Sequence, residues 1–305
     1  MLLPKSIPCE LLSHPLLDQK QVALQVLRLD QVHSEVSGNK FYKLQYNLQQ
    51  ALSQNHRQVL TFGGAYSNHI YATAAAAREL GLNSVGIIRG ELLDTRNPTL
   101  SYARTAGMTL LGIPREAYRQ KNNPNYLEKL RNQFGDFYLI PEGGTNALAI
   151  QGTREILTAR HSDFSHILTP IGTGGTFAGI AASLLPHQHL LGISALKGEG
   201  IHEELIDLLK AEGIQSLGSL EILTQYHQGG YAKWTRELIH FIHWFWDAFG
   251  IPLDPIYTGK MSFACWDLLQ QNYFPTGSRI LLIHTGGLQG NRGFTQRTGI
   301  ALPSF

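Results

Sequence analysis

The stretch HILTPIGTGGTFAGI, residues 166–180, decides the fold of this chain. A short apolar run reaches Gly172 and passes through a glycine–threonine cluster into a segment of helical composition. We expect a buried strand, a tight turn and a helix N-terminus in that order. At such a turn the backbone N–H groups can close on an anion, because the helix dipole favours negative charge there. For this stretch alone, a turn that merely needs glycine is the alternative.

The same pattern recurs along the chain from residue 59 onward. Short apolar runs, most of them ending in glycine, alternate with longer segments of helical composition. Strands that alternate with helices of this length predict parallel sheets in an α/β architecture. There is no internal repeat and no low-complexity linker, so we expect two interwoven lobes. The predicted strands, several with the turn that follows, are 59–64, 84–90, 108–113, 137–144, 166–176, 189–196, 220–224 and 279–287.

Composition excludes several classes of function. The chain has 305 residues, 16% charged, with a formal net charge of +2, which is too weak a basic balance to indicate nucleic-acid binding. Two cysteines exclude a disulfide framework, and the thirteen histidines show no recognisable zinc spacing, so we predict no metal site. The N-terminus has no continuous apolar run typical of a signal peptide, and the most apolar long segment, 231–250, carries four charged residues. We therefore expect a cytoplasmic protein that binds neither nucleic acid nor a membrane.

Four predicted strand ends carry small or polar clusters: GGAYSNH (63–69), PEGGTN (141–146), GTGGT (172–176) and HTGG (284–287). In open parallel sheets, ligands bind beyond the carboxyl ends of the strands. The chain lacks both the GxGxxG and the GK[ST] signatures of nucleotide sites, so a lone phosphate monoester suits the 172–176 cluster better.

A lysine precedes these clusters in the stretch SGNKFYKLQY, residues 37–46. Most lysines are solvated surface charges, and that is the alternative for Lys40. A lysine amine can also form a Schiff base with an aldehyde, and pyridoxal phosphate brings an aldehyde together with a phosphate monoester. A predicted phosphate-binding turn elsewhere in the chain makes it more plausible that Lys40 pairs with the aldehyde of pyridoxal phosphate.

In chain order, SGNKFYKL, GGAYSNH, GTGGTFAGI, LDPIYTGK and HTGG resemble the D-cysteine desulfhydrase and 1-aminocyclopropane-1-carboxylate deaminase family, from about residue 15 to residue 290. The resemblance implies a pyridoxal 5'-phosphate enzyme of fold type II, the tryptophan-synthase-β-like fold, that acts on a small amino acid. It also implies a homodimer. The expected lobes are a smaller one over 44–155 and a larger, discontinuous, cofactor-binding one over 1–43 plus 156–305.

The resemblance also assigns roles to individual residues. Catalytic roles fall to Lys40 as the Schiff-base lysine, Ser67, Tyr257 and Tyr231, either tyrosine being able to act as a base if its pKa fell below about 10. Cofactor-binding roles fall to Lys40, Lys43, Asn68, Gly172, Thr173, Gly174, Gly175, Thr176, Thr258 and Thr285. Substrate-binding roles fall to Tyr66, Ser67, Asn68 and His69. The alternative for Tyr231 is a packed aromatic residue at the start of an aromatic-rich helix, whose apolar stripe predicts core packing or a subunit interface.

Departures from the family pattern bear on the substrate. Tyr42, Gln45 and Tyr66 replace the usual arginine, glutamate and glutamine, and Thr258 stands where ring-opening members typically have glutamate. A neutral hydroxyl stabilises a protonated pyridine ring less than a carboxylate does, which favours β-elimination from D-cysteine or another β-substituted D-amino acid. The alternatives are ring opening of 1-aminocyclopropane-1-carboxylate and a non-catalytic protein that binds pyridoxal phosphate or an amino acid.

Overall fold

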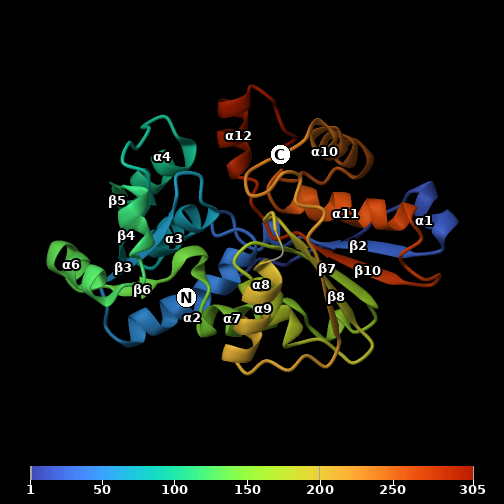
Figure 1. Cartoon of the computed structure of the whole chain (residues 1–305), viewed down its shortest axis with the longest axis horizontal. Helices are drawn as coiled ribbons and strands as arrows, with labels where there is room; N and C mark the ends of the chain where they lie inside the picture. The colour runs from blue at the N-terminus through green and yellow to red at the C-terminus, as the bar shows by residue number, and fades with distance from the viewer. Residues whose placement is uncertain (1, 199, 305) are drawn as a thin grey trace.

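Two open α/β lobes make up the structure, a computed structural model that describes residues 2–198 and 200–304 (Figure 1). The larger lobe holds a six-stranded sheet in the order β1-β2-β10-β7-β8-β9. All neighbours in it are parallel except β1, which pairs antiparallel with β2. Its strands are β1 (Cys9–Leu11), β2 (Ala23–Leu27), β7 (His166–Ile171), β8 (His189–Ser194), β9 (Ser219–Leu223) and β10 (Arg279–Ile283).

The smaller lobe holds a parallel four-stranded sheet in the order β5-β4-β3-β6. Its strands are β3 (Gln58–Gly64), β4 (Asn83–Arg89), β5 (Met108–Ile113) and β6 (Tyr138–Ile140). The chain thus starts in the larger sheet, builds the whole smaller sheet and then returns, so the predicted larger lobe is discontinuous. The exact boundaries, 44 and 155, stay a prediction.

Helices cover the faces of both sheets, as Figure 1 shows for α10 and α11 above the larger sheet. The α-helices are α1 (Pro15–Lys20), α2 (Asn39–Ser53), α3 (Asn68–Glu79), α4 (Pro98–Thr105), α5 (Arg115–Arg119), α6 (Pro124–Phe134), α7 (Ala147–Thr153), α8 (Gly175–Ala181), α9 (Gly200–Ala211), α10 (Arg236–Phe249), α11 (Thr258–Gln270) and α12 (Gly290–Thr298). Short 3-10 turns occupy Leu29–Gln31, Glu142–Gly144, Arg154–Ile156 and Ala159–His161. Helix α12 lies over the space between the lobes and packs against α4 of the smaller one.

Each strand predicted from the sequence is present, within a few residues of its expected limits. Strands β1 and β2 were not predicted from the sequence. Strand β2 lacks a glycine at its end, and its pairing partner is β10, more than 250 residues later, where Leu281 lies opposite Gln25. Only tertiary pairing identifies such a segment as a strand.

The aromatic helix α10 belongs to the core, as the apolar spacing predicts. Leu238, Phe241, Ile242 and Phe245 are buried in one cluster with residues of α11 and the larger sheet. Tyr231 is outside this helix, in a turn five residues ahead of its first residue. Among the described residues, no helix is long and apolar enough to cross a membrane.

Candidate active site

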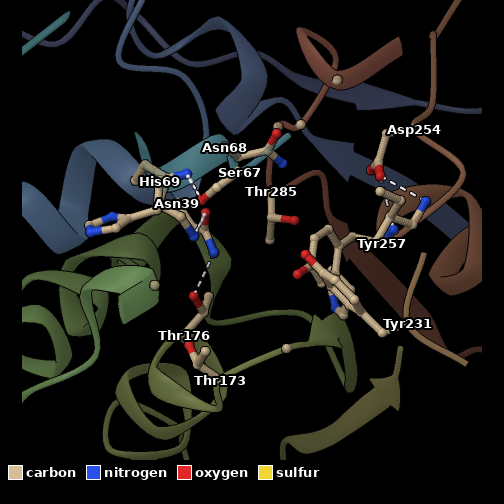
Figure 2. A pocket seen from close by; sticks show the side chains of 18 of the residues that line it. Asn39, Ser67, Asn68, His69, Thr173, Thr176, Tyr231, Asp254, Tyr257 and Thr285 are labelled. Atoms are coloured by element: carbon tan, nitrogen blue, oxygen red, sulfur yellow. Dashed lines mark hydrogen bonds between the residues drawn. The ribbon is translucent and has the colours of Figure 1, made fainter. Parts of the chain in front are cut away.

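The carboxyl ends of β3, β7 and β10 meet at a cavity of about 600 Å³ between the lobes. Thirteen of the predicted site residues line it, drawn from segments up to 245 residues apart: Lys40, Lys43, Tyr66, Ser67, Asn68, His69, Gly172, Thr173, Gly174, Thr176, Tyr231, Tyr257 and Thr285. The volume is within the range of small-molecule sites. Figure 2 draws 18 of the residues that line this cavity and labels ten of them, with Thr285 between Asn68 and Tyr257.

The start of α2 is pressed against the loop that follows β10. Gly38 has φ +68°, and a Cβ on it would lie 1.9 Å from the carbonyl oxygen of Thr285, so no other residue fits here without moving the backbone. The N–H of Asn39 donates to that same carbonyl at 3.2 Å. This contact joins the Gly-Asn-Lys turn to the HTGG loop and places Lys40 and Thr285 at one cavity.

Lys43 is buried and anchored at the opposite wall of the cavity. Its Nζ donates to the carbonyl of Gly143 at 3.1 Å and to the hydroxyls of Thr145 at 2.8 Å and Thr173 at 3.2 Å. A Cβ on Gly175 would lie 3.1 Å from this ammonium, so the start of α8 approaches Lys43 closely. The result is a cationic cup formed by the 172–176 turn, the 143–145 turn and one lysine.

Lys40 lies one helical turn before Lys43, on the same face of α2. Its Nζ donates to Asn39 Oδ1 at 3.3 Å, and Asn39 Nδ2 donates in turn to Thr176 Oγ1 at 2.8 Å (Figure 2). Burial lowers the pKa of Lys40 from 10.5 to about 8. An appreciable fraction of the amine is therefore neutral near pH 8 and nucleophilic toward an aldehyde.

Both lysines lack a carboxylate partner, since no ion pair joins either Nζ to an acid in residues 2–198 and 200–304. Burial, and then the charge of Lys40, lower the pKa of Lys43 well below its usual value. A buried cation without a counter-charge is costly, and a bound phosphate dianion removes that cost. An amine for the aldehyde and an uncompensated ammonium in a glycine-rich cup are the features that pyridoxal phosphate requires, so the site fits this cofactor.

The residues of the 67–69 stretch lie at the N-terminus of α3. Ser67 is the N-cap, and its Oγ accepts from the N–H of His69 at 3.2 Å and of Ile70 at 3.3 Å. Its hydroxyl hydrogen remains available to a ligand, and the helix dipole favours a carboxylate there. Asn68 lines the same wall, and its side chain lies close to Gly287 and Gly290.

His69 is almost fully buried, and its Nε2 pairs with Thr61 Oγ1 at 2.8 Å. Within the described part of the chain its Nδ1 has no hydrogen-bond partner. Burial, followed by the charges of Lys40 and Lys43, lowers the pKa of His69 well below its usual value, against a smaller opposite effect of the Pro141 carbonyl. The ring is therefore neutral, and it borders the cavity without offering a charge.

Tyr257 and Tyr231 lie together at the cavity, and the acid–base state of Tyr257 differs from the expectation. Their ring centroids are 6.3 Å apart, and both rings face the cavity (Figure 2). Burial first, and then the neighbouring Tyr231 phenol, raise the pKa of Tyr257 well above 10. The condition under which Tyr257 could act as a base, a pKa below about 10, is therefore not met. Its phenol stays protonated, and it can donate a proton or a hydrogen bond.

Thr258 is fully buried and is not among the residues that line the cavity. Its Oγ1 donates to Asp254 Oδ1 at 2.7 Å and accepts from the N–H of Asp254 at 2.9 Å. The hydroxyl is thus committed to the start of α11, and the structure does not place it as a cofactor-binding group. Gly175 likewise contributes to the cup from behind Lys43 without lining the cavity itself.

Sequence reasoning missed Asp254, a carboxylate that does line the cavity. It also accepts from the N–H groups of Ile256 at 2.9 Å, Tyr257 at 3.0 Å and Thr258 at 2.9 Å. With the Thr258 hydroxyl, these four donors occupy both oxygens. An aspartate shortly before a helix start is a capping signal that could have identified it. Asn39, which links Lys40 to Thr176, was also missed although it lies within the quoted Gly-Asn-Lys motif.

Of the departures at Tyr42, Gln45 and Tyr66, two do not line the cavity. Tyr42 is packed in the core against Phe41, with ring centroids 5.6 Å apart, and Gln45 also lies outside the cavity wall. Tyr66 does line the cavity. Of these three positions, only Tyr66 is placed to affect specificity directly. In the described chain, no three His, Cys, Asp or Glu residues gather as metal ligands.

Comparison with known proteins agrees with this geometry. The family described as "Pyridoxal-phosphate dependent enzyme" matches residues 9–286. The chain is 33% identical over 300 residues to the mitochondrial bifunctional D-cysteine desulfhydrase/1-aminocyclopropane-1-carboxylate deaminase of Arabidopsis thaliana, covering 88% of this chain and 73% of that protein. It is 29% identical to the D-cysteine desulfhydrase of Yersinia pestis, covering 94% and 92%. A solved structure, described as an ACC deaminase homologue, superposes with a TM-score of 0.83 at 27% identity, covering 97% and 94%.

Proposed function

The chain belongs to the family of pyridoxal-phosphate-dependent enzymes, and from this premise we propose that it catalyses β-elimination from a small β-substituted D-amino acid. D-Cysteine is the simplest substrate of this class. With one water molecule, it would give pyruvate, ammonia and hydrogen sulfide. The names of the Arabidopsis and Yersinia relatives support the substrate, since both include D-cysteine desulfhydrase.

The observation that carries the choice of β-elimination is the hydroxyl of Thr285 in the cavity, together with the saturation of the nearby carboxylate. Asp254 already accepts four hydrogen bonds from its own chain, so it has no free lone pair for a further donor. In this proposal Thr285 faces the pyridine nitrogen, and a hydroxyl favours the protonated ring less than a free carboxylate does. Expelling a thiolate demands less electron withdrawal than opening a cyclopropane ring.

The roles of the side chains follow from their positions. Lys40 would carry the cofactor covalently, and Lys43 with the 172–176 turn would hold the phosphate. Bound pyridoxal phosphate supplies the electron sink for the pair of electrons left at Cα. Asn68 would hold the phenolic oxygen of the cofactor, and Ser67 with the first N–H groups of α3 would hold the substrate carboxylate.

Proton transfer is assigned to two groups. Lys40, released by the incoming substrate amine, would remove the proton at Cα, because a lysine with a pKa of about 8 is partly neutral at working pH. Tyr257, held protonated by burial, would donate a proton to the departing sulfur. Tyr231, Tyr66 and His69 would border the substrate and exclude water from it.

A panel assay tests the proposal. Purified holoenzyme is offered D-cysteine, L-cysteine, 3-chloro-D-alanine, D-serine and 1-aminocyclopropane-1-carboxylate, and 2-oxo acid and ammonia are both measured. We expect pyruvate from the D-enantiomers with a good leaving group. Efficient release of 2-oxobutyrate from the cyclopropane would support the ring-opening deaminase instead. No turnover of any compound would favour a non-catalytic binding protein.

The oligomeric state and the cellular compartment are also proposals. We propose a homodimer, which the family resemblance implies, and a cytoplasmic location, which the amino-acid sequence predicts. Light scattering coupled to size exclusion would test the dimer against the 33.9 kDa of one chain. Fractionation of the source cells would test the compartment.

A further inference from the structure

A second cavity of about 370 Å³ adjoins the first, and residues of both lobes line it. The two share part of their walls, including Tyr66, Ser67 and Tyr231. Trp234 lines the second cavity and packs edge-on against Phe294 of α12, with ring centroids 5.5 Å apart. A molecule bound at Ser67 can therefore extend into this outer chamber without leaving the site.

Four cationic side chains line the outer chamber: Arg89, Arg115, Lys233 and Arg297. Among residues 2–198 and 200–304, no aspartate or glutamate lines it; the carboxylates of Glu142, Glu204 and Asp254 border the inner cavity instead. None of the four cations forms an ion pair with any acid of the described segments 2–198 and 200–304. The chamber is thus a concentration of uncompensated positive charge beside the reacting centre.

Aromatic rings hold two of these cations in place. The guanidinium of Arg297 lies 4.9 Å from the ring centroid of Tyr66, and that of Arg89 lies 5.6 Å from the centroid of Tyr118. Gly293 lets Tyr66 approach α12, since a Cβ there would lie 2.5 Å from the Tyr66 ring. Tyr66 therefore separates the inner cavity from the chamber while it supports Arg297.

The other negative groups expected in the site already have partners. The cofactor phosphate is assigned to Lys43 and the 172–176 turn, and the substrate α-carboxylate to Ser67 and the N-terminus of α3. Four further cations exceed what a zwitterionic substrate such as D-cysteine needs. Their charge is best matched by a second negative group at the distal end of the substrate.

We propose that the outer chamber binds an anionic group on the β-substituent, so that the enzyme prefers β-substituted D-amino acids whose leaving group carries a carboxylate, phosphate or sulfonate. This inference rests on the proposed function and names its substrate class. In the reaction, the Cα proton is removed, the Cβ–X bond breaks and X departs with the bonding electrons. One water molecule then releases ammonia and leaves pyruvate.

A matched pair of substrates tests the inference. S-Carboxymethyl-D-cysteine and S-carbamoylmethyl-D-cysteine have nearly the same shape and differ by one negative charge. We expect kcat/KM of the holoenzyme to be at least tenfold higher for the carboxylate in low-salt buffer. The preference should shrink as salt is added, because screening weakens attraction between exposed charges. O-Phospho-D-serine against O-acetyl-D-serine shows whether phosphate serves as well as carboxylate.

Variants assign the preference to the chamber. Arg115→Gln and Arg297→Gln should each bring the ratio between the paired substrates toward one, and Arg115→Gln does so without touching Tyr66. Arg104→Gln, an exposed arginine of α4 outside both cavities, should leave the ratio unchanged. A wild-type ratio near one, or a ratio that survives both substitutions, overturns the inference while the proposed function stands.

A binding measurement tests the outer chamber independently of the proposed β-elimination activity. Succinate and succinamate carry no amino group and are not turned over. Calorimetry on the holoenzyme should show tighter binding of succinate, with the difference lost in Arg115→Gln. If D-cysteine and all D-analogues fail as substrates, the proposed function fails. In that case this titration alone decides whether the outer chamber selects a ligand with a second negative group. Equal binding of the two acids would count against it.

Discussion

The Nζ of Lys260 in α11 donates a hydrogen bond of 2.8 Å to the carbonyl of Gly230, the residue before Tyr231. The turn that carries Tyr231 has positive φ at Gln228 (52°) and Ala232 (56°) as well as at Gly230 (113°). Left-handed backbone costs about 1 kcal/mol or more at a residue with a side chain. A buried ammonium therefore anchors a turn that its own backbone disfavours, and so positions Tyr231 over the cavity.

Replacing Lys260 by methionine should loosen this turn, because methionine keeps most of the side-chain volume but cannot donate. We expect faster amide hydrogen exchange over residues 228–233, and a raised KM for substrate. Mass spectrometry after exchange in D₂O measures the first effect. Lys210→Met, at an exposed position near the end of α9, is the matched control. Unchanged exchange in Lys260→Met would show that the turn holds without the lysine.

Attachment of the cofactor should depend on pH through Lys40. Because the pKa of Lys40 is about 8, the neutral amine rises about tenfold per pH unit below that value and levels off above it. The rate at which stripped protein takes up pyridoxal phosphate, followed by absorbance, should have this form. Borohydride reduction and peptide mapping should then place the cofactor on Lys40. An adduct on Lys43 or Lys260 would contradict the assignment.

Lys40 should lower the free energy of unfolding of the protein when no cofactor is bound. Its folded pKa is depressed, so folding disfavours the charged form; the cost is present at pH 7 and disappears as pH rises from about 8 toward 10.5. A shift of this size corresponds to about 3 kcal/mol at most. Lys40→Met should therefore raise the free energy of unfolding of the stripped protein at pH 7, and less so at pH 9.5. Urea titrations measure this, with exposed Lys129→Met as control.

Backbone groups, rather than the Thr173 hydroxyl, should dominate phosphate binding. A Cβ added at Gly175 would lie 3.0 Å from Thr145 Oγ1 and 3.1 Å from Lys43 Nζ, so Gly175→Ala pushes the start of α8, with its N–H groups, away from Lys43. We expect a loss of cofactor affinity of about tenfold or more, and a smaller loss in Thr173→Ala, which removes one hydroxyl. Titration of stripped protein with pyridoxal phosphate gives both constants, and thermal unfolding checks that the variants fold. A larger effect of Thr173→Ala would show that the hydroxyl dominates.

Asp254 should contribute more to stability than its hydrogen-bonding partner Thr258. Asp254→Asn leaves buried donors without acceptors, at about 2–4 kcal/mol in total, whereas Thr258→Val removes a single hydroxyl, at about 1 kcal/mol. Urea unfolding of the two variants at pH 7.5 compares these costs. Equal free energies of unfolding would mean that the amide accepts from the same donors as the carboxylate.

Much of the fold was predictable because its signals are local in sequence. Apolar runs of strand length, glycine at their ends and helical segments between them indicate parallel α/β units, and the 172–176 turn indicates an anion site. Strand β2 was not predictable in this way, because its partner β10 lies more than 250 residues away. Its own five residues carry no terminal glycine, and Gln25 interrupts an otherwise apolar run.

The candidate site also has one part that local sequence predicted and another that only tertiary contacts decided. The Gly-Asn-Lys motif suggested Lys40 as a lysine for an aldehyde, and the family resemblance implied Lys43 as the cation for the phosphate. No motif indicated which side chains remain free to bind a ligand or to transfer a proton. Thr258 is occupied by Asp254, Tyr42 is turned into the core, and Tyr257 is protonated by burial beside a second phenol.

By itself, therefore, the sequence indicated the α/β class and an anion-binding turn, because strand, turn and helix-capping signals depend on neighbours along the chain, and its resemblance to a family implied the cofactor and the residues expected around it. The tertiary structure alone decided the electrostatics of the site. Lys43 reaches Gly143 and Thr173 from 100 and 130 residues away, and the cations of the outer chamber come from both lobes. Burial, pKa and uncompensated charge are properties of the neighbours in space, and only the folded chain brings those neighbours together.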